Sequence, residues 1–342
     1  MPVPWQQLLQ GASARWQDNE LTAFTEPVAE ARQALASDII APLPSLAIVE
    51  VSGADATEFL HSQLSNDIRA LPEHGSCLAA YCNPKGRMLA LFRVVRRADS
   101  LLLLFPAGLV ESTLKRLRLY VLRSKVTFTD LGDQWAAMDI SGPNVAARLA
   151  TLGLSLPEQV DEGTSHEDAL VLRLPGATPR GLIVAPQQRI GRLWSALDGL
   201  ERVGEQAWRL LKIRAGVPEV LPGAVEKFIP QAANLDLLNG ISFSKGCYPG
   251  QEIVARLHYR GNVNRRMYRL TLESAALPAP GTDVRTVDGS LAGELVMAAP
   301  GPDGGTEALA VLQVRQAGER LLVDGHAATA EAPPYLPEPQ AE

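Results

Sequence analysis

The sequence predicts an α+β fold with more than one domain, in which β-α-β-β units are followed by a small β-rich domain. The chain has 342 residues, more than one compact core of ordinary size holds. Two segments, residues 48–53 and 138–143, share the order of a strand, a Ser-Gly pair and the start of a helix. From residue 267 to residue 323, short alternating segments lie between Pro-Gly, Asp-Gly and Gly-Gly turns, which predicts a β-barrel or sandwich.

The first β-α-β-β unit is predicted from alternating apolar residues in its strands, from one helix and from one turn. Apolar residues at helical spacing from Ala56 to Leu64 predict a helix directly after the first strand. A turn is expected at 83–87, where Pro84 presets φ and Gly86 is free to adopt a positive φ. The strands expected in this unit are 46–51, 78–82, 88–95 and 100–105.

Further elements follow from the same patterns along the rest of the chain. Gly216 is placed to end a helix, and Pro218 stands two residues later as a stop signal. The helices expected after the first unit are 109–121, 205–215 and 249–257. The strands expected in the second unit are one that opens at Met138, 169–174 and 181–185.

Composition and charge limit the classes of function. With a formal net charge of −6, the chain is a poor candidate for coating nucleic acid through many phosphate contacts. The three cysteines, Cys77, Cys82 and Cys247, include no C-x-x-C pair, which argues against zinc or thioredoxin spacing and favours a reducing cytoplasm. The five histidines are scattered, so we expect no bound metal. The sequence shows no signal peptide and no apolar run of membrane-spanning length, so we expect a cytoplasmic protein without a membrane partner.

Cys247 lies in a segment whose residue types suit thiol chemistry. Lys245 stands two residues before it, and a helix is expected to begin just after it, with Pro249 near its first position. A nearby ammonium and a helix N-terminus both stabilise a thiolate. Gly246 and Gly250 leave the backbone free to approach a ligand. The residues alone leave two interpretations equally open, a reactive thiolate or a buried cysteine in a tight loop before a helix.

The charge of the chain changes sign around this cysteine. Residues 245–269 hold six basic side chains against one acid, Glu252, which can pair with Arg256 one helical turn later. Such a reversal indicates an anionic ligand, for which a glutamate tail, a phosphate or RNA would qualify. A solvated face that carries several arginines explains the pattern equally well. The basic residues are Lys245, Arg256, Arg260, Arg265, Arg266 and Arg269.

Trp208, on the expected helix 205–215, is the aromatic residue that we considered for ligand binding. Its ring could stack on a flat heterocycle, but a tryptophan at helical spacing from Leu211 is more often part of the core. The residues alone therefore favour a position in the core.

The segment Lys245-Gly246-Cys247-Tyr248-Pro249-Gly250-Gln251-Glu252 resembles the YgfZ family, whose mark is K-G-C-Y-x-G-Q-E, and it has all seven fixed positions. The flanking Pro230-Gln231-Ala232-Ala233-Asn234 and Tyr259-Arg260-Gly261 are similar to the family as well. Three more segments, 60–67, 82–87 and 124–126, also look like family segments. The resemblance covers nearly the whole chain and is weakest at the N-terminus and in the C-terminal domain.

This family resembles the T-protein aminomethyltransferase of glycine cleavage, and the resemblance implies the architecture of this chain. It implies three domains with βαββ units of ferredoxin-like type around a central folate pocket, and a C-terminal β-barrel rather than a sandwich. The implied domains are 1–120 with 205–266, which together form a discontinuous folate-binding domain, 121–204, the barrel at 267–331, and a disordered tail at 332–342.

The resemblance also implies roles for individual residues. Cys247 corresponds to the cysteine on which the family's function depends, with Lys245 and Tyr248 beside it in a motif that includes Gly246, Gly250, Gln251 and Glu252. Trp208 corresponds to a tryptophan assigned to folate contact, which replaces the core position favoured above. The partner aromatic of that site falls at Leu46, so half of the stacking is missing. The implied folate-binding set is Trp208, Leu46, Gln231 and Asn234.

One departure bears on the reaction. Aminomethyltransferases carry an acidic pair shortly after the turn that corresponds to 83–87, and the matching residues here are Ala90 and Leu91. Without that carboxylate, the group that assists folate-nitrogen chemistry is missing, and a shared fold does not imply a shared reaction. If a transferase activity exists, Glu219, Glu226 or Asp236 would have to supply the acid or base.

The resemblance therefore predicts a function outside conventional enzymology. We expect a tetrahydrofolate-binding accessory protein that acts through Cys247 in the assembly or repair of iron–sulfur proteins, including enzymes that thiolate tRNA. The alternatives are a folate-dependent one-carbon or aminomethyl transferase and, with less support, a factor that binds tRNA directly through its arginines. Iron–sulfur client proteins are the expected partners, and we expect a monomer.

Overall fold

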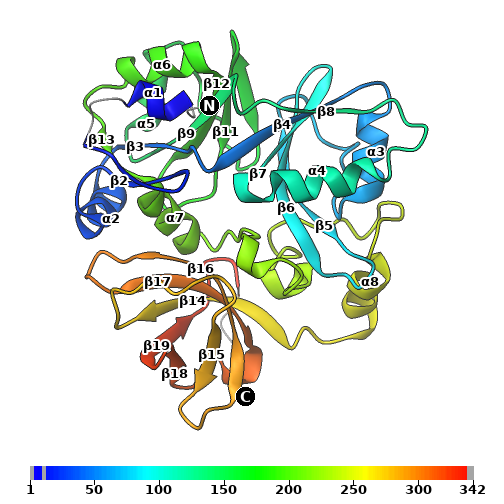
Figure 1. The fold of residues 1–342 in the computed structure, drawn as a ribbon, viewed down its shortest axis with the longest axis vertical. Coiled ribbons are helices and arrows are strands. Elements are labelled where there is room, and N and C mark those ends of the chain that lie inside the picture. The colour runs from blue at the N-terminus through cyan, green and yellow to red at the C-terminus, as the bar shows by residue number, and fades with distance from the viewer. Residues whose placement is uncertain (1–3, 10–12, 337–342) are drawn as a thin grey trace. The chain divides into compact units, whose positions relative to one another are not determined.

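The computed structural model describes residues 4–9 and 13–336 and has the mixed helix and sheet content that the sequence predicts. Its elements are labelled in Figure 1. The chain divides into two compact units. The first unit consists of residues 1–60, 68–77 and 92–211, and the second of residues 61–67, 78–91 and 212–342. The three-domain boundaries implied by the family resemblance stay a prediction.

A six-stranded sheet is the largest sheet of the first unit. Its strand order is β10-β11-β12-β9-β3-β13, antiparallel except for the short β13–β3 pair. The strands are β3 (Ile39–Pro42), β9 (Trp135–Ser141), β10 (Gly163–His166), β11 (Ala169–Arg173), β12 (Arg180–Pro186) and β13 (Glu201–Arg202). The sequence patterns identified the buried strands β9, β11 and β12, whereas the short outer strands β10 and β13 and the short, buried inner strand β3 were missed.

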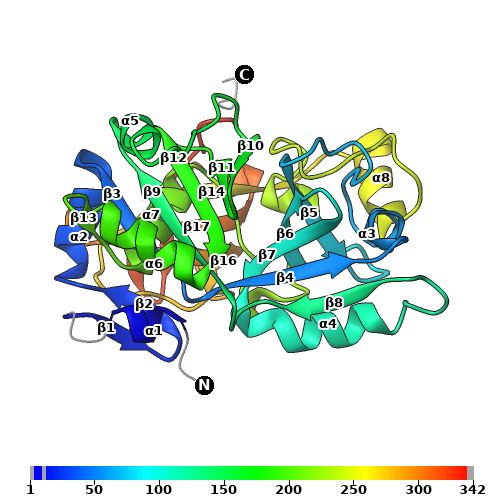
Figure 2. The same ribbon diagram turned by 90° about the horizontal axis from the view of Figure 1, so that it is seen from above.

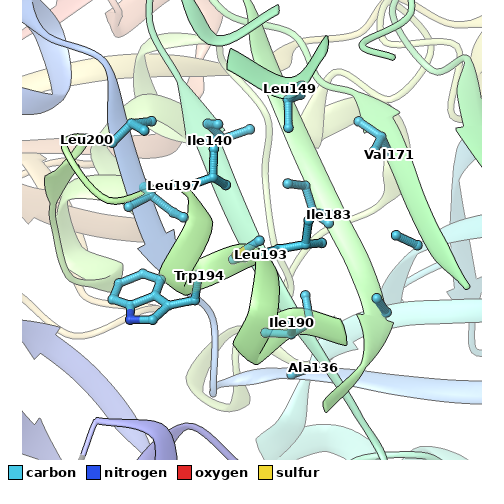
Figure 3. Packing of buried hydrophobic residues seen from close by; sticks show 14 of the residues in the cluster. Ala136, Ile140, Leu149, Val171, Ile183, Ile190, Leu193, Trp194, Leu197 and Leu200 are labelled. Carbon is cyan, nitrogen blue, oxygen red and sulfur yellow. The ribbon is translucent and has the colours of Figure 1, made fainter. Parts of the chain in front are cut away.

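Helix α6 (Gln187–Ala196) covers part of this sheet, packing against β9 and β12 (Figure 2). Its apolar residues Ile190, Leu193 and Trp194 recur at helical spacing and are buried. They pack on inward-facing strand residues such as Ile140 and Ile183, as Figure 3 shows. Complete burial of side chains of this size stabilises the unit by about 1.5–3 kcal/mol each. Helix α5 (Val145–Ala150) adds Leu149 to the same core.

The second sheet has the strand order β5-β6-β7-β4-β8. Its strands are β4 (Leu46–Ser52), β5 (Ser76–Cys82), β6 (Met88–Arg96), β7 (Ser100–Pro106) and β8 (Thr127–Asp130). Within the first unit, β4 lies between β7 and β8 and pairs antiparallel with both. The helices α3 (Ala56–Gln63) and α4 (Val110–Arg118) follow β4 and β7. A core cluster joins residues of both sheets, including Ile39 of β3 and Ile48 of β4.

The repeated strand, Ser-Gly and helix order has a structural counterpart in the first unit. Gly53 after β4 has φ +110° and Gly142 after β9 has φ +140°, which are values that L side chains rarely adopt. A Cβ on Gly53 would collide with the carbonyl oxygen of Lys125, and one on Gly142 would collide with Asp38. Both turns therefore need glycine. Pro143 lies two residues before α5.

A closed barrel forms the C-terminal part of the second unit, as the family resemblance implies. Its strand order is β14-β17-β16-β15-β18-β19, drawn in yellow to red in Figure 1. The barrel closes because β14 pairs antiparallel with both β17 and β19. The strands are β14 (Arg265–Leu272), β15 (Asp283–Thr286), β16 (Leu291–Pro300), β17 (Thr306–Gln313), β18 (Leu321–Val323) and β19 (His326–Glu331). The alternating segments expected between residues 267 and 323 thus belong to a barrel and not to a sandwich.

The segment after β19 is described as far as Leu336, so the expected disorder does not begin at residue 332. The Tyr335 hydroxyl donates a hydrogen bond to the carbonyl oxygen of Gly216, at 2.6 Å. Gly216 has φ +69° after helix α7 (Glu205–Arg214), and this confirms its predicted place at the helix end. The remainder of the predicted tail, residues 337–342, lies outside the described residues.

Glu205, the first residue of α7, is fully buried in the first unit. Its carboxyl group accepts hydrogen bonds from the backbone amides of Leu21 (3.1 Å) and Ser45 (3.2 Å) and from the Ser45 hydroxyl. Burial disfavours the charged carboxylate and raises the pKa of Glu205 from 4.5 to about 8. At neutral pH the folded chain therefore favours the protonated acid.

Glu205 gives the unfolding free energy a defined pH dependence. Above about pH 4.5 the unfolded chain releases this proton, whereas the folded chain retains it until about pH 8. The unfolding free energy should therefore fall between these values as pH rises, by at most about 1.4 kcal/mol per pH unit. Glu205→Gln cannot titrate, so its unfolding free energy should lack this pH-dependent fall. Chemical denaturation of both proteins at pH 5 and pH 8 measures the difference. Parallel pH profiles for the wild type and the variant would contradict the assignment.

Candidate functional site

The segment 245–252, referred to below as the cysteine loop, belongs to the second unit and leads into helix α8 (Gln251–Arg260). Lys245 anchors its start, because its ammonium group donates hydrogen bonds to the carbonyl oxygens of His61 and Leu64, the latter at 2.7 Å. These carbonyl groups lie at the end of α3, where a cation is favourable. The Lys245 ammonium thus holds the cysteine loop on the segment 60–67.

Tyr248 anchors the loop from its other side. Its side chain is buried, and the Lys245 ammonium lies 4.8 Å from the centre of its ring, within the range of a cation–π interaction. Burial raises the pKa of the Tyr248 phenol well above its usual value, with a smaller contribution from Cys82. Burial likewise raises the pKa of the Cys82 thiol to about 12. Tyr248 and Cys82 are therefore neutral at physiological pH.

Gly250 fixes the end of the loop by packing against the turn 83–87 that joins β5 and β6 (Figure 1). It is the N-cap of α8 and has φ +82°. A Cβ at Gly250 would lie 2.5 Å from the carbonyl oxygen of Asn83 and 2.7 Å from the Cα of Gly86. Gly86 itself has φ +72°, and its own Cβ would lie 3.1 Å from the Cβ of Ile253. The two glycines allow the turn and the helix start to approach closely.

The turn is held by its own asparagine. The Oδ1 of Asn83 accepts hydrogen bonds from the backbone amides of Lys85 (2.9 Å) and Arg87 (3.1 Å). Its Nδ2 donates to the Glu226 carboxylate at 3.1 Å, and the Arg87 guanidinium donates to the Lys227 carbonyl oxygen. This arrangement confirms the turn predicted from its Asn, Pro and Gly residues.

The expected helix after Cys247 begins later than predicted. It runs over Gln251–Arg260, whereas 249–257 was predicted, and Pro249 precedes the N-cap instead of occupying the first turn. The positive φ of Gly250 is the reason, because a residue in this conformation cannot belong to a right-handed helix. Glu252 lies in the first turn, where a carboxylate is favourable. It forms no ion pair with Arg256 in the part of the chain that the structure describes.

Cys247 itself is exposed, unlike the residues that fix the loop around it. Cys77 is half-buried and Cys82 is buried. The interpretation of Cys247 as a buried cysteine in a tight loop is therefore wrong. Lys245, Tyr248 and Gly250 are used to hold the loop in place, whereas the Cys247 thiol faces solvent.

Trp208 and Leu46, two of the four residues assigned to folate, lie in the first unit. Trp208 is buried in the core cluster shared by the two sheets, and Leu46 packs against the same cluster. The guanidinium of the buried Arg180 donates a hydrogen bond to the carbonyl oxygen of Trp208 at 3.4 Å and ion-pairs with the buried Asp139. The structure thus gives Trp208 the core position that the residues alone favoured. Its contact with folate stays a prediction.

Gln231 and Asn234, the other two, lie in the second unit and are almost completely buried. Asn234 exchanges two hydrogen bonds with the backbone of Met267, at 2.8 and 3.1 Å, and so holds the start of β14. Gln231 donates from Nε2 to the carbonyl oxygen of Val254 in α8 at 2.6 Å. Its Oε1 accepts no hydrogen bond from the described residues, so only Gln231 retains a buried acceptor for a ligand.

Half of the basic residues around the cysteine loop are committed to partners. Lys245 caps α3, as described above. Arg266 binds Asp236 through two hydrogen bonds of 2.6 and 2.9 Å, and Arg269 pairs with Glu331 at 2.6 Å. The three that remain are exposed and form no ion pair with a described residue. They are Arg256, Arg260 and Arg265.

An aromatic cluster in this region was missed by the sequence analysis. Phe243 stacks on His258, with ring centres 3.7 Å apart and planes 12° from parallel. Tyr259 meets both rings edge to face. The adjacent His258 and Tyr259 are visible in the sequence, but the stacking of Phe243 on His258 depends on tertiary packing.

Residues 4–9 and 13–336 contain neither of two further kinds of site. No group of three His, Cys, Asp or Glu side chains there is arranged to hold a metal ion. No described helix has both the length and the apolar character needed to cross a membrane.

Comparison with known proteins identifies the family. The model of the GCVT N-terminal domain matches residues 11–160. The tRNA-modifying protein YgfZ of Sodalis glossinidius is 33% identical over 284 residues, which cover 82% of this chain and 86% of the relative. The chain belongs to the YgfZ family. The YgfZ protein of Pectobacterium atrosepticum is 32% identical, over 78% of this chain and 81% of its own length.

The fold of this YgfZ family member also matches a solved structure over nearly its whole length. The glycine cleavage aminomethyltransferase T of Bartonella henselae superposes with a TM-score of 0.74, covering 98% of this chain and 97% of that one, at 19% identity. This likeness confirms the predicted GcvT-like fold. Ala90 and Leu91, the residues predicted to stand at the position of the acidic pair of aminomethyltransferases, are buried in β6 of this chain.

Proposed function

We propose that this YgfZ family member is a folate-binding accessory protein that supports iron–sulfur proteins, including enzymes that modify tRNA, through the thiol of Cys247. The relatives named above are described as tRNA-modifying proteins, and this description supports a role of this chain in tRNA modification. The assignment to iron–sulfur proteins and folate goes further and draws on the family resemblance and on the cysteine loop.

The observation that carries the proposal is the contrast between Cys247 and its neighbours. The residues around it are anchored by hydrogen bonds, burial or close packing, whereas the thiol is exposed. A loop that is fixed on both sides presents a sulfur atom in a defined position to an incoming partner at little entropic cost. A thiolate is a natural ligand for iron–sulfur clusters and a nucleophile toward sulfur species.

Folate is the ligand that the fold family implies, and one feature of the second unit suits it. Gln231 has a buried Oε1 that accepts no hydrogen bond from a described residue, and a pterin ring offers N–H donors to such an acceptor. Trp208 and Leu46 belong to the first unit, where the Trp208 ring is buried in the core cluster, so their proposed contact with folate rests on the family resemblance alone. Asn234 fits less well, because its amide is already bonded to the backbone of Met267.

A folate-dependent transferase receives less support from the acidic residues of the second unit. The three acids that could replace the missing pair are each held by a partner. Glu219 pairs with Lys212 at 2.6 Å and Asp236 with Arg266 at 2.6 Å, while Glu226 accepts a hydrogen bond from Asn83. A general base must be able to reach the substrate proton, and these carboxylates are engaged elsewhere.

The role of Cys247 can be tested in cells that lack their own YgfZ. We expect Cys247→Ala and Cys247→Ser to reduce iron–sulfur enzyme activity and thiolated tRNA nucleosides to the level of cells without the protein. The half-buried Cys77 provides a matched control, and Cys77→Ala should complement like the wild type. Full complementation by both Cys247 variants, at equal protein levels, would contradict a role for the thiol.

The folate assignment can be tested by calorimetric titration of the purified chain with tetrahydrofolate. Trp208→Leu should weaken binding roughly tenfold, the loss expected for one stacked ring, and Trp208→Phe should lose less. Trp194, buried in the other core cluster, is the matched control, and Trp194→Leu should bind like the wild type. Equal affinities for all variants that remain folded in thermal melts would contradict the contact at Trp208.

A further inference from the structure

The exposed side of α8 carries a surface that the proposed function does not use. Phe243, His258 and Tyr259, referred to below as the ring cluster, are stacked or edge to face with one another. Tyr259 is 68% exposed, and His258 is exposed as well. A packed group of aromatic rings that remains open to solvent is unusual, because aromatic side chains normally contribute to cores and interfaces.

Arginines that form no ion pair with a described residue surround the ring cluster. Arg256 and Arg260 lie three residues before and one residue after Tyr259, and both are exposed. Residues three and four positions apart are neighbours on a helix surface, so Arg256 lies beside both Tyr259 and Arg260. Arg265 follows at the start of β14. These guanidinium groups form no ion pair with a described residue, although the chain as a whole has a net charge of −6.

We propose that the ring cluster and its arginines bind single-stranded RNA. An unpaired base stacks on an exposed aromatic face, and guanidinium groups neutralise the phosphates that flank it. Double-stranded RNA offers no such base, because its bases are stacked within the helix. An acidic protein would pair with the arginines but would gain little from the ring faces. The exposed amides of Asn262 and Asn264, which follow α8, suit hydrogen bonds to base edges and 2′-hydroxyl groups.

This inference does not depend on folate or on the Cys247 thiol. The ring cluster and Cys247 are nevertheless linked through one helix, because α8 begins directly after the cysteine loop. RNA bound along α8 would therefore lie on the helix that follows the exposed thiol. Such a surface would bring the chain to the RNA substrate of a modifying enzyme.

The test uses the full-length protein and a fluorescently labelled single-stranded RNA of about twelve nucleotides, followed by anisotropy at low salt. We expect Tyr259→Ala to weaken RNA binding about tenfold, because one stacked base is lost. Tyr259→Trp should preserve binding, because tryptophan retains a ring on which the base can stack. Arg256→Ala/Arg260→Ala should weaken binding and lower the slope of log affinity against log salt by about 1.4. Thermal melts of these exposed variants should match the wild type.

Matched controls come from another exposed basic segment. Tyr120 is 46% exposed and is followed by the exposed Arg123 and Lys125, but no described ring stacks on it. Tyr120→Ala and Arg123→Ala/Lys125→Ala should leave RNA affinity unchanged. The inference is overturned if no RNA binds at low salt, if Tyr259→Ala binds like the wild type, or if the arginine variants at both segments weaken binding equally. Equal affinity for the duplex or for DNA of the same sequence would also overturn it.

Discussion

The close approach of Gly250 to Gly86 is the contact on which the second unit's candidate site depends. Both residues have positive φ, and a side chain on Gly250 would collide with the backbone of the 83–87 turn. Together with the Lys245 ammonium on the end of α3, this contact joins three segments that are far apart in the sequence, 60–67, 82–87 and 245–252. All three segments resemble the YgfZ family. Their shared contact network explains why all three carry this resemblance.

The residues of the cysteine loop have two different roles. Some hold the loop in place, whereas Cys247 is exposed to solvent. Lys245, Tyr248 and Gly250 are committed to hydrogen bonding, burial and backbone packing, which leaves Cys247 exposed on a fixed loop. The same distinction applies to the basic residues around it, half of which bind a partner within the chain. The functional proposals for this region therefore rest on the Cys247 thiol and on the three arginines that form no ion pair with a described residue.

Local patterns predicted much of the fold, and contacts between distant segments explain most of the differences. Long apolar strands such as β4 and β9 were found because burial leaves a clear pattern, whereas β13 and β15 are too short to show one. The start of α8 was misplaced because Gly250 takes its positive φ from contact with residues 83–86. The motif identified Cys247, but its exposure, the internal partners of Asn234 and the ring cluster depend on tertiary packing that no local pattern records.

The unfolding free energies of Gly250→Ala and Gly246→Ala, measured by chemical denaturation, test this account most directly. The two glycines belong to the same loop, but a Cβ at Gly246 would have only His61 Nε2 within reach, at 4.0 Å. Gly250→Ala should lower the unfolding free energy by about 1–3 kcal/mol because of its positive φ and the collision with the turn. Gly246→Ala should change it by less than about 0.5 kcal/mol. Equal effects of the two substitutions would contradict the claim that the contact between Gly250 and Gly86 holds the cysteine loop.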